Sequence, residues 1–152
     1  KIKQFLYEPY HYFYHLNKKE AMTAIKKILE QVSMDETCLE KYPHELSGGQ
    51  LQRISIARAL IIQPQLLICD EITSSLDQVF QRDIIELLKQ CVYKYHMAIL
   101  FISHDLSLVH EFCHQVLVLN DGKIIEKGTI QQLYKSKNEV VQDLLSAAYL
   151  NG

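Results

Sequence analysis

Two short segments of the chain carry residue types suited to phosphate and magnesium chemistry. One reads Leu-Ser-Gly-Gly-Gln from Leu46 to Gln50, and the other is an apolar run from Leu66 that ends in Asp70 and Glu71. Helix N-termini expose unpaired N–H groups and a partial positive charge, so a helix that opens with glycines can hold a phosphate. Two acids after a strand can hold Mg²⁺ through water and supply a base for phosphoryl transfer.

Each segment also has a plainer explanation. Gly48-Gly49 alone would more often follow an ordinary helix cap, and an Asp-Glu pair alone would more often be a solvated loop. The interpretation as a phosphate site gains weight from His104, because Ser103-His104-Asp105 ends the next predicted strand. An imidazole donor at the same edge of a sheet can contact a γ-phosphate.

The loop that usually cradles the nucleotide, G-x-x-x-x-G-K-S/T, is absent from the printed sequence. The one Gly-Lys pair is Gly122-Lys123, with Leu117 in place of the first glycine and Ile124 in place of the hydroxyl. The chain also begins with Lys1. We therefore expect the chain to be the second part of a larger nucleotide-handling protein.

The apolar pattern predicts helices first and an α/β sheet afterwards. Asn17 with Glu20 forms a capping box for one helix, and Ser47 opens another that stops before Pro64. Beyond Pro64, short apolar runs predict buried parallel strands that alternate with helices. The predicted strands are 66–69, 98–102 and 116–119, and the predicted helices between them are 79–91 and 105–113. The third strand is predicted to turn at Asn120-Asp121-Gly122 into the segment 123–126.

Composition excludes several classes of protein. The 152 residues have a formal net charge of −2, which gives no electrostatic reason to expect nucleic acid as a partner. The apolar runs are too short to span a bilayer, and no secretory signal opens the chain. The four cysteines lack C-x-x-C spacing and are expected to be buried thiols in a reducing, cytosolic compartment.

One short motif points to a different chemistry. His110 to His114 fits H-E-x-x-H, a zinc protease pattern. A zinc site would need both histidines on one sustained helical face and a third ligand. The helix is predicted to end near Cys113, so we expect no zinc here.

Four motifs together resemble the ATPase subunits of ABC transporters, over Lys1 to about Gly128. Leu46 to Gln50 matches the signature motif, Leu66 to Glu71 matches Walker B, and His104 matches the switch histidine. The D-loop is matched by Ser74, Ser75, Leu76 and Asp77.

More narrowly, the chain resembles the importer branch for oligopeptides, dipeptides and nickel. This resemblance rests on Glu8-Pro9, on residues 41–45 before the signature and on residues 101–109, while residues 110–116 look closest to nickel-type members. Ile72 departs from the proline usual in the family, and the segment from Ser136 lacks the common His-Pro-Tyr stretch.

The resemblance implies a partial P-loop NTPase fold, with a parallel α/β sheet and an α-helical subdomain. We expect residues 1–60 to form the helical subdomain, 61–128 the part of the α/β core with Walker B, D-loop and switch histidine, and 129–152 the C-terminal helices. The implied partners are a second ABC ATPase domain, transmembrane permease subunits and, indirectly, an extracellular solute-binding protein. The implied location is the cytoplasmic face of the membrane, and the segment from Leu6 to Leu16 is a candidate groove wall for the permease.

The same resemblance assigns roles to the site residues. Ser47, Gly48, Gly49 and Gln50 would contact, in trans, an ATP held by the partner domain. Asp70 would hold Mg²⁺ through water, Glu71 would be the catalytic base, and His104 would contact the γ-phosphate. Without the P-loop, the 152 residues alone are expected to bind ATP weakly, to hydrolyse none and to associate through uncovered strands. The alternatives are a non-transport ABC ATPase and a non-enzymatic remnant that only docks with a partner ATPase.

Overall fold

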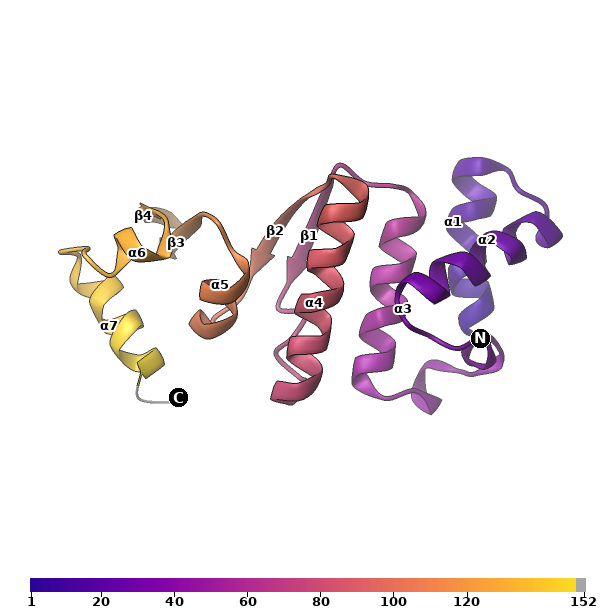
Figure 1. Cartoon of the computed structure of the whole chain (residues 1–152), viewed down its shortest axis with the longest axis horizontal. Coiled ribbons are helices and arrows are strands. Elements are labelled where there is room, and N and C mark those ends of the chain that lie inside the picture. The colour runs from indigo at the N-terminus through magenta and orange to yellow at the C-terminus, as the bar shows by residue number, and fades with distance from the viewer. Residues whose placement is uncertain (150–152) are drawn as a thin grey trace. The chain divides into compact units, whose positions relative to one another are not determined.

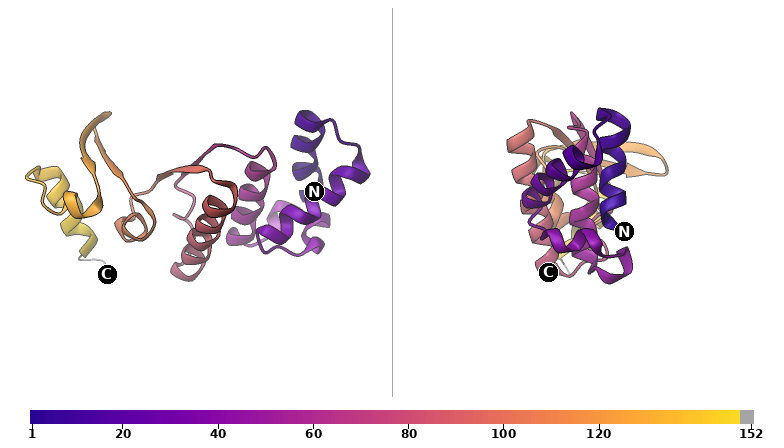
Figure 2. Two further views of the ribbon diagram at one scale, coloured as in Figure 1. Left: turned by 45° about the horizontal axis from the view of Figure 1, so that its top comes forward. Right: turned by 90° about the vertical axis from the view of Figure 1, so that its right-hand side faces the viewer.

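The computed structural model describes the backbone of residues 1–149 and the side chains of residues 1–146. The chain divides into two compact units, residues 1–100 and residues 101–152 (Figures 1 and 2). We describe each unit by itself. The three segments expected from the sequence are a different partition and remain a prediction.

The first unit begins with a helix that the sequence analysis did not predict. Helix α1 (Ile2–Tyr14) contains Pro9 in its interior, a residue that normally discourages a helix. Ile2, Leu6 and Pro9 are nevertheless buried at helical spacing. Burial of this face against the helices that follow outweighs the local preference of the proline.

Helices α2 (Lys18–Gln31) and α3 (Gly48–Ile61) pack with α1 (Figure 2). The predicted capping box of α2 is confirmed, because Asn17 accepts from the backbone N–H of Glu20 while Glu20 accepts from that of Asn17. Two 3₁₀ helices, η1 (Glu36–Glu40) and η2 (Pro43–Glu45), lie between α2 and α3. The first of them ends three residues before Pro43, and the second begins at Pro43.

A small parallel sheet follows, made of β1 (Leu66–Asp70) and β2 (Ala98–Ile102). Helix α4 (Gln78–Tyr95) connects the two strands and lies alongside them (Figure 1). The strands were predicted to be buried, and this expectation is wrong for one face. Cys69 is buried, whereas Leu66, Ile68 and Leu100 are 53%, 60% and 44% exposed. The sheet has two strands and α4 covers one face, so alternate side chains stay in solvent.

The second unit contains α5 (Leu106–Phe112), β3 (Val116–Asn120), β4 (Lys123–Gly128), α6 (Ile130–Leu133) and α7 (Glu139–Tyr149). In the described part of the chain, β3 pairs with β4 as an antiparallel hairpin and not with the parallel sheet. The predicted turn from 116–119 into 123–126 is confirmed, whereas the expectation that 116–119 joins the parallel sheet is wrong. Asp121 and Gly122 turn the hairpin with φ of 47° and 73°, and these positive values at both central positions favour such a tight two-residue connection.

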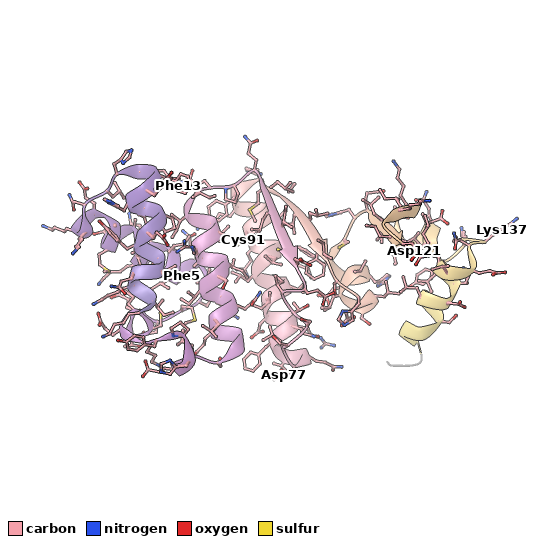
Figure 3. The ribbon with its side chains drawn as sticks, turned by 180° about the vertical axis from the view of Figure 1, so that it is seen from behind. Phe5, Phe13, Asp77, Cys91, Asp121 and Lys137 are labelled. Atoms are coloured by element: carbon pink, nitrogen blue, oxygen red, sulfur yellow. The ribbon has the colours of Figure 1, made fainter. Side chains whose placement is uncertain are left out.

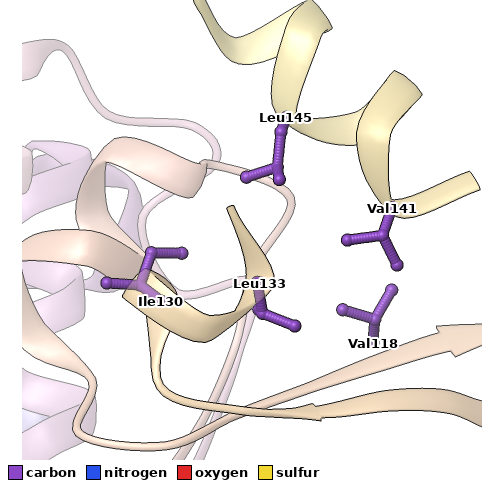
Figure 4. Close-up of a cluster of buried hydrophobic side chains, with 5 residues drawn as sticks. All are labelled: Val118, Ile130, Leu133, Val141 and Leu145. Atoms are coloured by element: carbon purple, nitrogen blue, oxygen red, sulfur yellow. The ribbon is translucent and has the colours of Figure 1, made fainter. Parts of the chain in front are cut away.

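The core of the second unit lies between the hairpin and the last two helices. Figure 4 shows the side chains that meet there, namely Val118, Ile130, Leu133, Val141 and Leu145. Helix α6 is held by a capping box, in which Thr129 and Gln132 exchange hydrogen bonds of 2.8 and 3.3 Å. This unit therefore has apolar packing of its own.

Candidate functional site

The signature segment forms the N-terminus of α3. Ser47 has an extended backbone, and its Oγ accepts a hydrogen bond of 3.3 Å from the N–H of Gln50. In return, the Gln50 side-chain oxygen accepts one of 3.1 Å from the N–H of Ser47. The first N–H groups of a helix have no intrahelical acceptor, so this end carries partial positive charge and donors. The structure confirms that Ser47 opens a helix, as expected from the sequence, and the binding of an anion there stays a prediction.

Gly48 and Gly49 also permit a close approach of neighbouring side chains. A Cβ added to Gly48 would lie 3.4 Å from Cδ2 of Leu76, and one added to Gly49 would lie 3.3 Å from Cδ1 of Phe80. The structure thus brings the signature segment against residues at and just after the predicted D-loop. Phe80 was not singled out in the sequence, because nothing local marks a contact between residues so far apart in the chain.

Asp70 is the last residue of β1, and Glu71 follows it at the C-terminal end of the strand. Both side chains are exposed. Glu71 has a φ of 50°, a left-handed conformation that is uncommon for a residue with a side chain. Its carbonyl oxygen accepts hydrogen bonds from Ser74, from Oγ at 2.9 Å and from the N–H at 3.2 Å. The chain therefore turns sharply after Asp70 and joins the acids to the predicted D-loop.

The predicted D-loop ends in the cap of α4. Asp77 accepts hydrogen bonds from the N–H groups of Val79 and Phe80, at 3.1 and 3.2 Å. Figure 3 shows Asp77 at the start of this helix, with Cys91 further along it. Thr73 is a buried polar residue whose carbonyl oxygen accepts a 3.1 Å bond from the Gln81 side chain. These bonds fix the loop onto the first turn of α4.

His104 belongs to the second unit and lies between β2 and α5. The Oγ of Ser103 accepts a 3.0 Å bond from the N–H of Asp105. Asp105 in turn caps α5 by accepting from Ser107 and Leu108. The imidazole of His104 is exposed and follows the strand at its C-terminal end, as predicted. The neighbours of His104 thus define the turn that presents it.

An open groove of about 380 Å³ lies between α1 and α3, away from the motifs described above. Most of its lining is apolar, with one hydroxyl and one cation: Phe5, Pro9, Phe13, Ser55, Arg58, Ala59 and Ile62. Arg58 forms a 2.7 Å ion pair with Glu8, and its guanidinium carbon lies 4.2 Å from the centre of the Phe5 ring. Figure 3 marks Phe5 and Phe13 on the same helix. The groove includes part of the segment predicted to be a groove wall.

The cysteines behave as buried thiols. Cys38, Cys69 and Cys91 are buried and free, and Cys113 is half-buried and free. Burial, with a smaller contribution from Cys91, raises the pKa of Cys69 to about 11. A thiol with such a pKa stays protonated and unreactive near neutral pH.

Neither a membrane span nor a clustered metal site is found in the parts of the chain that the structure describes. None of the helices there is long and apolar enough to cross a membrane. The described residues include no group of three or more His, Cys, Asp or Glu side chains placed to hold a metal. Helix α5 ends at Phe112 and Cys113 is extended, so His110 and His114 do not share a helix. The two histidines of the H-E-x-x-H pattern therefore lack the common helical face that a zinc protease site needs.

Comparisons with known proteins give a consistent result. Residues 3–74 match the family model described as ABC transporter. The chain is 44% identical over 129 residues to the nickel import ATP-binding protein NikE of Escherichia coli (strain K12), and equally to those of Shigella boydii serotype 4 and Shigella sonnei. Each alignment covers 85% of this chain and 48% of the relative. The chain thus spans about half the length of the curated relatives it matches.

Proposed function

Because this chain belongs to the ABC transporter family, we propose that it supplies the signature, Walker B, D-loop and switch-histidine parts of a subunit that binds and hydrolyses ATP. The observation that carries the proposal is the order of these motifs on their elements. The signature opens α3, the Walker B acids end β1, the D-loop precedes α4, and His104 follows β2. In α/β folds, ligands bind at the carboxyl ends of strands and phosphates bind at helix N-termini.

We further propose import of nickel or a metal chelate as the transport function. The support is the printed name of the relatives, nickel import ATP-binding proteins, at 44% identity. Small peptides are the second candidate, because the sequence resembles a branch that includes peptide importers. A transport assay with nickel and with small peptides must decide between the two.

The signature residues are proposed to act on an ATP held by a second ABC ATPase domain. Ser47 and Gln50 hold the first turn of α3 through their reciprocal hydrogen bonds. That turn presents the N–H groups of Gly48 and Gly49, which suit the oxygens of a γ-phosphate. The Ser47 hydroxyl is a further donor for the same oxygens.

Asp70 and Glu71 are proposed to act on an ATP held within the same subunit. Asp70 is exposed at the end of β1, and a carboxylate oxygen is the donor type that Mg²⁺ prefers, so this residue would hold the ion through water. Bound Mg²⁺ would neutralise phosphate charge. Glu71 would orient and deprotonate the attacking water, and His104 would donate to the γ-phosphate. The reaction depends on positioning and charge neutralisation, which is why a lysine-bearing phosphate loop is also required.

The groove between α1 and α3 is the proposed contact for a transmembrane permease subunit. Its mostly apolar lining with one cation suits an amphipathic segment of a partner. A subunit engaged in this way would lie at the cytoplasmic face of the membrane and serve an extracellular solute-binding protein indirectly. The net charge of −2 favours no nucleic acid as a partner.

The experiment that tests this function compares the chain alone with the chain joined to a segment that supplies the phosphate loop, taken from the Escherichia coli relative. The 152 residues alone are expected to bind ATP weakly and to show no turnover. The joined protein is expected to hydrolyse ATP in the presence of Mg²⁺. Turnover by the isolated chain would refute the inactivity of the fragment. A folded joined protein without turnover would instead favour a remnant that only docks with a partner ATPase.

A further inference from the structure

The first turns of α3 and α4 meet through a glycine and an aromatic ring. Gly49 is buried, and an added Cβ would lie 3.3, 3.6 and 3.8 Å from Cδ1, Cγ and Cβ of Phe80. Gly48, one residue earlier, is similarly close to Leu76. The side chains of the loop before α4 and of its first turn therefore occupy the space that the two glycines leave open.

Both helix starts are capped by side chains. Ser47 and Gln50 close a capping box on α3, and Asp77 caps α4 through Val79 and Phe80. A second connection lies further along the same two helices, where Arg53 and Asp83 approach to 3.6 Å. Two capped helix starts that touch over a small area cannot move independently without opening that contact.

We propose that Phe80 is a positioning residue that holds the signature turn, Ser47 to Gln50, and the D-loop, Ser74 to Asp77, as one mechanical body. On this proposal, position 49 requires glycine because any side chain there would press against the Phe80 ring. A change in the D-loop is passed to the phosphate-facing end of α3 through Phe80. The assignment of functions to both segments rests on the proposed ATPase role, but their physical coupling does not.

Hydrogen exchange of the full chain, without nucleotide, tests the coupling directly. The probes are the N–H groups of Gln50 and Leu51, which are bonded to Ser47, while the N–H groups of Ala59 and Leu60 report on the far end of α3. Replacing Phe80→Ala should raise exchange at the two N-terminal probes roughly five- to tenfold, the size of a contact coupling, and leave the far end unchanged. Phe80→Leu should restore most of the protection.

Val79→Ala is the matched control, because Val79 lies in the same turn of α4 and is 70% exposed. It should leave all four probes unchanged. Equal acceleration along the whole of α3 would show a merely structural role and overturn the proposal, as would no change at Gln50 and Leu51.

A second variant keeps the proposal testable if Phe80→Ala fails to fold. Gly49→Ala places a methyl group against the ring, so it should accelerate exchange at Gln50 and Leu51 in the native background. In the Phe80→Leu background the smaller, flexible side chain can yield, and the same substitution should have no such effect. Identical effects in both backgrounds would overturn the coupling. Because no ATP is used, these results stand apart from success or failure of the ATPase proposal.

Discussion

The guanidinium of Arg53 on α3 donates a 3.0 Å hydrogen bond to the carbonyl oxygen of Val32, the C-cap residue of α2. The side chain is 18% exposed and also lies 3.6 Å from the Asp83 carboxylate of α4. The last carbonyl groups of a helix have no N–H donor within the helix, and a charged side chain can supply the missing hydrogen bond. Arg53 therefore ties the helix of the signature to the helices on either side of it.

Removal of this tie should weaken the first unit. Arg53→Gln shortens the side chain and removes its charge, so the Val32 carbonyl loses its donor and the pair with Asp83 is lost. We expect the free energy of unfolding to fall by about 1.5–3 kcal/mol, the range for a hydrogen bond to a charged group. Urea unfolding followed by circular dichroism measures it. Arg82→Gln, at an exposed neighbouring position on α4, should change stability little. An equal loss in both variants would contradict the assignment.

The cap of the signature helix should be measurable as stability. Ser47→Ala removes the acceptor for the N–H of Gln50, and we expect a loss of about 1 kcal/mol in urea unfolding. Ser55→Ala is the matched control, because Ser55 lies on the same helix and its hydroxyl bonds only back to the Leu51 carbonyl. Alanine is the better helix former there, so that variant should be neutral or slightly stabilising. A Ser55→Ala variant as unstable as Ser47→Ala would speak against a special role for the cap.

The stability of the first unit should depend on acid through Glu40. Hydrogen bonds from Lys1 and Lys3 hold the pKa of Glu40 down, to about 2, below its usual 4.5. The depressed folded-state pKa means that this contribution is complete above the ordinary pKa and is lost as pH falls from about 4.5 towards 2. Glu40→Gln should flatten the pH dependence of the melting temperature in that window. An unchanged profile would show that the exposed pairs contribute nothing.

How much of this structure the sequence predicts depends on how local the cause is. The capping box of Asn17 with Glu20 acts within four residues and appears as predicted, and Ser47 opens α3 as predicted. Helix α1 escapes prediction because Pro9 argues against a helix, whereas burial against distant segments favours one. The left-handed Glu71 has no local signal either, since β1 and the Ser74 hydrogen bonds impose that turn.

In the candidate site, too, locally determined features are predicted from the sequence and contacts between distant residues are not. The residue types and their order indicate where Ser47, Asp70, Glu71 and His104 lie relative to helix starts and strand ends. They say nothing of Phe80 or Arg53, whose importance comes from contacts between α3 and its neighbours. Burial was predicted for both faces of β1, and this was wrong for one of them. Apolar residues in a strand do not determine which other elements pack on its two faces, and one face of β1 is left exposed.

The bare face of β1 predicts self-association of the chain. Ile68 and Leu66 are more than half exposed there, and uncovered apolar strands favour contact between copies. Ile68→Lys should shift the sedimentation profile towards monomer. Val79→Lys adds the same charge at an exposed position on α4 and should leave association unchanged. A wild-type chain that is monomeric at every concentration would contradict this expectation.

The central claim is that Glu71 acts as the base for ATP hydrolysis, and the most direct measurement separates ATP binding from turnover. In the protein joined to a phosphate-loop segment, Glu71→Gln keeps the shape of the side chain and removes its basicity. We expect turnover to fall at least about 100-fold, the lower range for loss of a general base, with ATP affinity unchanged. Glu86→Gln, at an exposed glutamate on α4, is the control and should retain full turnover. Undiminished hydrolysis by Glu71→Gln, or loss of ATP binding in place of turnover, would contradict the account.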